Sequence, residues 1–180
     1  MSPLMQAAEQ MEISSEAMNL LDPDMSASNA ITELVSQDLL QDALKLEARL
    51  LPKRYAVAWA CQCARGQLTS FEDKAGAQLA EQWVRDPSEA NRRAAFEFAN
   101  RGGYRSCGTW IAASAGWSGG SLAPSGQTVP VPPPDQLTAK AVVAAINLLA
   151  AMVEPEFDAR RRTFITQALT LLGEAPAGGL

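Results

Sequence analysis

Histidine is absent from the 180 residues of this chain. Histidine is the side chain that most often takes a proton from a serine or cysteine nucleophile. Its absence therefore excludes hydrolases that depend on a Ser–His or Cys–His pair. The exclusion matters because residues 116–120, GWSGG, match the G-x-S-x-G signature of a nucleophilic serine.

The serine of that match is Ser118, and its surroundings do not fit the motif. G-x-S-x-G normally joins a β-strand to a helix, whereas the preceding residues 110–115, WIAASA, are small, apolar and typical of a helix. A lysine can replace histidine as the base, but none of the chain's lysines forms S-x-x-K with Ser118; they are Lys45, Lys53, Lys74 and Lys140. We expect the match to be incidental, the protein not to be an enzyme, and no residue to be catalytic.

Cysteine is scarce, with Cys61, Cys63 and Cys107 as the three examples. A structural zinc site usually takes four cysteine or histidine ligands, and this chain has too few. The three cysteines therefore predict packed, reduced thiols and no metal or cofactor site, and the sequence assigns them no further role.

A long hydrophobic run is also missing. The longest apolar stretch, residues 141–153, is shorter than the roughly 20 residues that span a bilayer. The first residues, MSPLMQAAEQ, lack the basic and apolar regions of a signal peptide. These features predict a cytoplasmic protein without membrane insertion.

Acidic residues outnumber basic ones by 20 to 15, so the net charge is −5 at pH 7. Nucleic-acid binding needs a basic face, so we expect no nucleic-acid partner. Two arginine pairs, Arg92–Arg93 and Arg160–Arg161, remain candidate contacts for an anion or a protein partner. The simpler interpretation is solvated charge with ion pairs to nearby acids.

Alternation of apolar and polar residues is absent too, and the periodicity is helical nearly throughout. The sequence predicts a single compact all-α domain of about seven or eight short helices over residues 12–173. The apolar segment 139–153 is the expected central helix. We predict a flexible N-terminal tail at residues 1–11 and a C-terminal tail at residues 174–180. Predicted helix starts include a capping box at Thr69 and Glu72, an N-cap at Asp86, and Asp135 or Thr138 before the central helix.

The longest irregular segment is rich in glycine and proline. We call residues 118–136 the strap. A segment of this length without secondary structure is typical of a functional or disordered loop. One interpretation makes it a docking site for another protein; the other packs Leu122, Val129 and Val131 on the chain's own core, and the sequence leaves both open. The candidate interaction residues are Trp117, Ser118, Gly119, Gly120, Leu122, Pro124, Val129, Val131, Pro132, Pro133 and Pro134.

Several stretches together resemble one bacterial family. They are residues 39–64, 81–100, 116–124 (GWSGGSLAP) and 129–151, which begins VPVPPPDQLTAK. The chain is similar, over about residues 12–173, to small proteins of unknown function found in Proteobacteria and commonly encoded near type VI secretion genes. Members often carry a histidine before the Leu-Pro at residues 51–52, where this chain has none.

The resemblance implies a cytoplasmic accessory of a contractile secretion apparatus, such as an adaptor or chaperone for a spike or effector protein. Our leading hypothesis is therefore a non-enzymatic protein acting through protein–protein interaction. Two alternatives remain open: a helical bundle that binds an apolar ligand, and an enzyme that works without histidine. The oligomeric state is also open.

Overall fold

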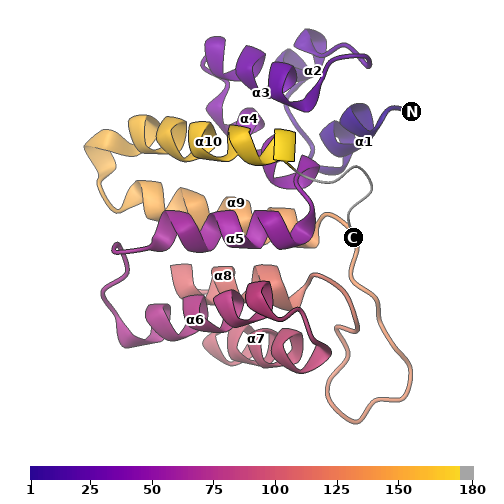
Figure 1. Ribbon diagram of the computed structural model, residues 1–180, viewed down its shortest axis with the longest axis vertical. Coiled ribbons are helices and arrows are strands. Elements are labelled where there is room, and N and C mark those ends of the chain that lie inside the picture. The colour runs from indigo at the N-terminus through magenta and orange to yellow at the C-terminus, as the bar shows by residue number, and fades with distance from the viewer. Residues whose placement is uncertain (175–180) are drawn as a thin grey trace.

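The structure is a computed structural model, and it describes residues 1–174 as a compact all-helical domain (Figure 1). No β-strand occurs within these residues. The helices are α1 (Pro3–Gln10), α2 (Ser15–Leu20), α3 (Ala27–Ser36), α4 (Leu40–Leu50), α5 (Lys53–Ala64), α6 (Phe71–Arg85), α7 (Glu89–Gly102), α8 (Cys107–Gly116), α9 (Leu137–Ala151) and α10 (Phe157–Glu174), with a short 3₁₀ turn, η1 (Glu154–Glu156), before α10.

Serine begins most of the well-capped helices. In each case the serine Oγ accepts a hydrogen bond from the backbone N–H three residues later, which satisfies one of the free donors of the first turn. The caps are Ser2, Ser14, Ser26, Ser70, Ser88 and Ser106. The predicted caps at Thr69 and Asp86 were therefore wrong, because the neighbouring serines Ser70 and Ser88 hold those positions.

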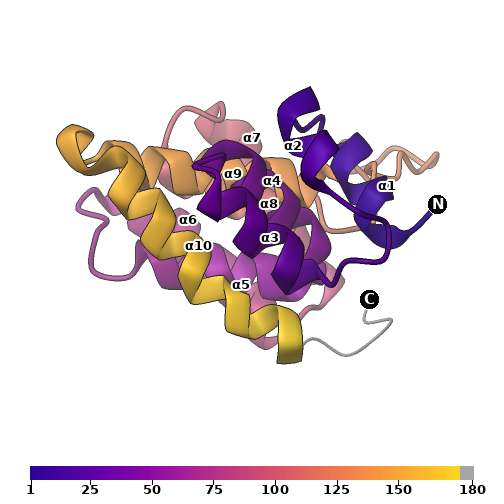
Figure 2. The same ribbon diagram turned by 90° about the horizontal axis from the view of Figure 1, so that it is seen from above.

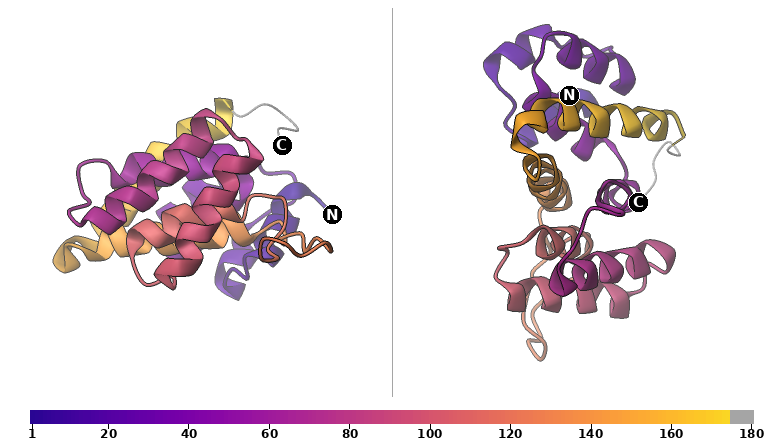
Figure 3. Two further views of the ribbon diagram at one scale, coloured as in Figure 1. Left: turned by 90° about the horizontal axis from the view of Figure 1, so that it is seen from below. Right: turned by 90° about the vertical axis from the view of Figure 1, so that its left-hand side faces the viewer.

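Helix α9 lies at the centre of the fold, as its composition predicted. Figures 1 and 3 place α6, α7 and α8 at one end, α5 and α9 across the middle, and α10 with α1–α4 at the other end. From above, α10 crosses over α5 and α9 (Figure 2). Much of α9 is itself buried, and its buried residues include Ala141, Val142, Ala145, Ile146 and Leu149.

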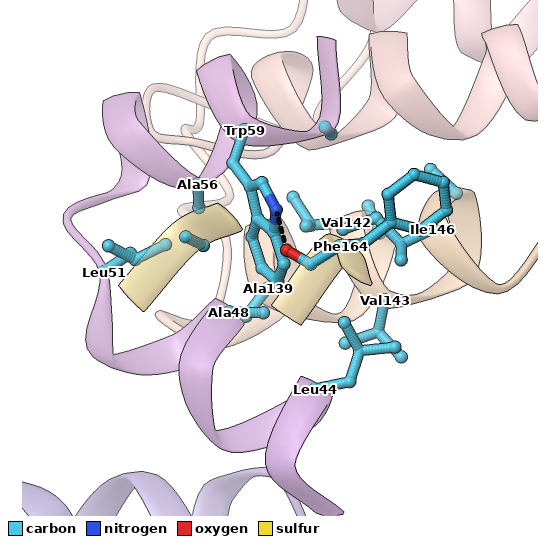
Figure 4. Packing of buried hydrophobic residues seen from close by; sticks show 14 of the residues in the cluster. Leu44, Ala48, Leu51, Ala56, Trp59, Ala139, Val142, Val143, Ile146 and Phe164 are labelled. Carbon is cyan, nitrogen blue, oxygen red and sulfur yellow. Dashed lines mark hydrogen bonds between the residues drawn. The ribbon is translucent and has the colours of Figure 1, made fainter. Parts of the chain in front are cut away.

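Two contacts show how the layers are joined. The indole N–H of Trp59 on α5 donates to the backbone oxygen of Phe164 on α10 at 3.0 Å, within the apolar cluster of Figure 4. At the other end, Gly76 of α6 lies directly against Gly108 of α8, and a Cβ on Gly76 would overlap the Gly108 backbone. The small residues there let the two helices approach closely.

The N-terminal tail predicted for residues 1–11 was wrong. Residues 3–10 form α1, and Leu4, Ala8 and Met11 are buried in the core. With α1 included, the described residues contain ten α-helices, against the seven or eight predicted.

The start of α9 also differs from the prediction. Gln136 is its N-cap, without a side-chain cap bond. Thr138 instead donates its hydroxyl to the Ser114 backbone oxygen at 2.9 Å, joining α9 to α8. At the other terminus Glu174 ends α10, and the rest of the predicted C-terminal tail lies outside the described residues.

The length and apolar composition of the helices show whether any of them could span a membrane. Within the described chain, no single helix is long and apolar enough to cross a membrane. Helices α9 and α10 meet that test only as a pair, and the pair is bent by 119°.

Candidate functional site

The strap begins where α8 ends, and two glycines fix its path. Gly116 closes α8 against α7, where an added Cβ would lie 2.6 Å from the Cα of Phe96. Gly120 has φ of 63°, and a Cβ there would lie 2.6 Å from the Nε of Arg92. These are the two glycines of the G-x-S-x-G match, so packing accounts for both.

Ser118 follows a helix. Its hydroxyl donates to the backbone oxygen of Ala115 at 2.7 Å, one turn back. The nearest contact with a lysine involves its backbone: Lys53 donates from Nζ to the Ser118 carbonyl oxygen at 3.1 Å. Lys53 also lies 3.6 Å from the Asp135 carboxylate. Lys53 thus lies beside Ser118, but it bonds the Ser118 backbone and pairs with Asp135, and so joins the two ends of the strap.

Arg92 anchors the first part of the strap from inside the protein. Its side chain is buried, and Nη1 donates to the Gly116 carbonyl oxygen at 2.6 Å. Two further bonds, of 2.7 and 2.6 Å, reach both carboxylate oxygens of Glu89. These bonds with Arg92 lower the pKa of Glu89. The paired charge makes Arg92 a fixed support for the chain around Gly120.

Arg93, the next residue, holds the second part. Its guanidinium donates to the backbone oxygens of Ser121 at 3.2 Å and Ala123 at 2.8 Å, and to the Ser125 hydroxyl at 3.1 Å. Glu97, one turn along α7, accepts from the same Ser125 hydroxyl at 3.0 Å. Arg93 and Glu97 are paired at 3.4 Å. The Arg93–Glu97 pair on α7 therefore binds the strap mainly through hydrogen bonds to the strap's backbone.

Beyond this anchor the strap closes on itself. The backbone N–H of Leu122 donates to the Val131 oxygen at 2.8 Å, and the Val131 N–H donates to the Ser121 hydroxyl at 2.9 Å. Residues 121–131 thus form a closed loop of the Ω type. Gly126, with φ of 95°, turns the chain at its far end.

The outer part of this loop is exposed. We call residues 124–131 (PSGQTVPV) the tip; all eight are exposed, and none carries a charge. Val129 is 71% exposed and Val131 48%. The interpretation that packs Val129 and Val131 on the core is therefore wrong. It holds only for Leu122, which is half-buried at the base of the loop, next to the buried Ala123.

A pocket of about 310 Å³ lies between the tip and α7. Its walls come from Arg93, Phe96 and Arg101 on one side and from Leu122 and Pro124 on the other. The Arg93 guanidinium lies 5.1 Å from the centre of the Phe96 ring. The pocket thus combines apolar walls with charged side chains of both signs, because Glu97 lines it as well.

Trp117 precedes the strap and belongs to an aromatic cluster. Its ring centre lies 6.0 Å from that of Trp110 and 5.4 Å from that of Tyr104. All three side chains are partly buried. The cluster gives the strap a rigid starting point at the end of α8.

The remaining candidate arginines lie elsewhere. Arg160 donates to the Leu149 backbone oxygen at 2.9 Å and also bonds Gln67. Arg161 bonds Gln41 at 3.1 Å and Asp158 at 2.7 Å. Both join α10 to its neighbours, and their role as anion or partner contacts stays a prediction.

Two residues of the site were not singled out from the sequence: Lys53 and Phe96. Each contacts a segment that is distant in the chain, so no local pattern marks it. Arg93 was predicted as a candidate contact, but for a partner; its observed ligand is the chain's own strap, some 30 residues away.

Comparison with known proteins places the chain in a family. A model described as a family of unknown function (DUF6931) matches residues 30–172, which include the strap and both of its arginine anchors. No curated protein and no solved structure matches the chain. Because the match covers most of the sequence, this chain belongs to the family of unknown function DUF6931.

Proposed function

We propose that this protein is a non-enzymatic accessory protein that binds another protein through the tip of its strap. One observation carries the proposal: Val129, 71% exposed, lies on an uncharged loop whose base is fixed to α7 by Arg93. An apolar side chain held out on an anchored loop is a feature expected of a binding surface.

The prolines strengthen this argument. Pro124 and Pro130 lie within the tip, and Pro132–Pro134 follow it. Proline fixes φ, and it reduces the conformational entropy that a loop loses on binding. A partner with an aromatic-lined groove therefore gains both apolar contact with the valines and a pre-extended backbone.

The proposed partner is a protein of a type VI secretion system, such as a spike, an effector or another adaptor, and the proposed place of action is the cytoplasm. The support is the resemblance of residues 116–124 and 129–151 to a family commonly encoded near such genes. The two segments contain all of the strap except residues 125–128, so the resemblance overlaps the proposed docking surface at Pro124 and residues 129–131.

Absence of catalysis is part of the proposal. Its support is that the Ser118 hydroxyl is engaged with a helix carbonyl, that Lys53 contacts the Ser118 backbone, and that the chain has no histidine. Treatment with a fluorophosphonate probe is expected to leave Ser118 unmodified. A covalent adduct on Ser118 in the intact protein would contradict this part.

Affinity purification from the native cell tests the partner. The tagged wild-type chain is compared with a Val129→Asp, Val131→Asp double variant, and recovered proteins are identified by mass spectrometry. We expect a secretion-system protein with the wild type and its loss with the variant. Equal recovery by both baits would refute docking through the tip; recovery of a tip-dependent partner unrelated to secretion would refute the secretion link.

A further inference from the structure

A second surface of the protein lies along α5 and α6, apart from the strap. Three adjoining open pockets, of about 370, 100 and 380 Å³, follow the two helices. The first two share Cys61, Arg65 and Glu81, and the last two share Ala58 and Val84. They therefore form one continuous depression, which we call the α5–α6 groove; Figure 1 shows these two helices side by side.

The floor of the groove is apolar. Small side chains from both helices line it, and Leu68 and Leu171 lie toward its two ends; the small residues are Ala58, Cys61, Ala64 and Ala77. On the opposite side α8 packs against both α5 and α6. Helix α8 thus covers the side of the α5–α6 pair that faces the core, while the opposite side, with the groove, is open to solvent.

The rim of the groove carries charge of the opposite sign to the whole chain. Four basic side chains line it, Arg54, Arg65, Lys74 and Arg85, against one acidic side chain, Glu81. The local balance is +3, whereas the chain carries −5. Arg65 and Arg85 both pair with Glu81, at 3.6 and 3.2 Å, but their side chains are 71% and 73% exposed and so remain open to a partner's carboxylates.

An exposed aromatic residue continues one edge of the groove. Phe71 begins α6 and is 90% exposed. It lies three residues before Lys74 and seven before Gln78, so it shares their helix face. The edge therefore offers a large apolar side chain at the end where Lys74 supplies positive charge.

We propose that the α5–α6 groove binds an acidic amphipathic helix of a partner protein. The apolar floor suits leucine-like side chains at i, i+3, i+4 and i+7, and the basic rim suits flanking carboxylates. From Arg54 to Arg65 the groove follows roughly 16 Å of α5, about three helical turns. A nucleic acid would match the rim but leave the apolar floor and Phe71 unused, which favours a protein segment.

Synthetic peptides test the proposal. The probe is a fluorescein-labelled peptide of about four turns, with leucines on one face and glutamates on both flanks; its twin has lysine in place of each glutamate. By fluorescence anisotropy we expect the acidic peptide to bind, more weakly as salt is added, and the basic twin not to bind. Equal binding of the two peptides, or no binding of either, would overturn the proposal.

Charge reversal locates the binding surface. Lys74→Glu is expected to weaken binding of the acidic peptide at least about tenfold. Arg105→Glu, which makes the same charge change at an exposed arginine outside the groove, should not. If Lys74→Glu alters the circular dichroism spectrum, Arg65→Glu takes its place. Equal affinities for the groove variant and the Arg105 control would rule out the α5–α6 groove as the binding surface.

Two further measurements distinguish binding in the groove from docking at the tip and from dimerisation through the groove. The Val129→Asp variant of the tip should bind the acidic peptide as the wild type does, because the groove contains no tip residue. Light scattering of the chain alone should give a mass that Lys74→Glu does not change. A dimer dissociated by Lys74→Glu would instead assign the groove to a second copy of this chain and overturn the proposal.

Discussion

The Nη2 of Arg93, on α7, lies 2.8 Å from the backbone oxygen of Ala123, in the strap. This bond and its neighbours to Ser121 and Ser125 hold the base of the closed loop while the tip remains exposed. The loop is therefore an anchored projection. Arg93 therefore acts together with Arg92 and Lys53 to fix the part of the strap that carries the proposed docking surface.

Arg93→Ala should release the loop without unfolding the domain. Three hydrogen bonds to the strap are lost, and we expect a stability loss of about 1–2 kcal/mol because backbone carbonyls at the surface regain water. The amide protons of Leu122 and Val131 should exchange at least about tenfold faster. Hydrogen exchange followed by NMR measures both. Arg105→Ala is the control, and unchanged protection in Arg93→Ala would contradict the anchoring role.

Gly116 should behave as a packing residue. In Gly116→Ala the new methyl group would lie 2.6 Å from the Phe96 Cα, so α7 and α8 must separate. We expect a loss of about 1–3 kcal/mol in the free energy of unfolding, as for other overpacked sites. Gly119→Ala is the matched control, because nothing lies within 4 Å of its added Cβ. Urea denaturation compares the two, and equal stabilities would contradict the packing account of the G-x-S-x-G match.

Glu47 presents a buried carboxyl group that the proposed function does not use. The residue on α4 is fully buried, and neither carboxyl oxygen has a hydrogen-bond partner among the described residues. Burial raises its pKa from 4.5 to about 9. The folded protein therefore holds Glu47 protonated at neutral pH, whereas the unfolded chain ionises it.

This shift predicts a pH-dependent stability. The pKa of Glu47 is higher in the folded protein than in the unfolded chain. Protonation of Glu47 therefore contributes fully to the free energy of unfolding below about pH 4.5, and this contribution is lost as pH rises through about 9. Glu47→Gln removes the titration, so its stability relative to wild type should increase by about 1.4 kcal/mol per pH unit within that range. Urea denaturation of both proteins at several pH values measures the difference. A constant difference across pH would show that Glu47 does not titrate abnormally.

Local patterns in the sequence explain much of the fold. The all-α class and the central position of α9 followed from helical periodicity and from an apolar segment without a polar face. Helix α1 was missed because its apolar pattern is short, although Ser2 and Pro3 form a recognisable cap and first turn. At α6 and α7 the predicted caps were displaced by one or two residues because several neighbouring side chains were able to cap.

The candidate site was predictable only in part. The glycine and proline content marked the strap, and Arg92–Arg93 were singled out as candidate contacts. That the two belong together could not be predicted, since a contact between Arg93 and Ala123 depends on how α7 packs against α8. The same holds for Lys53, which reaches Ser118 from another helix.

The most direct test of the account compares two aspartate substitutions of exposed valines. Val129 lies in the tip, and Val153, 40% exposed, follows α9 at a distance in the sequence from the strap. With the partner purified, calorimetric titration should show that Val129→Asp weakens its binding at least about tenfold and that Val153→Asp binds as the wild type does. Equal affinities for both variants would contradict docking through the tip.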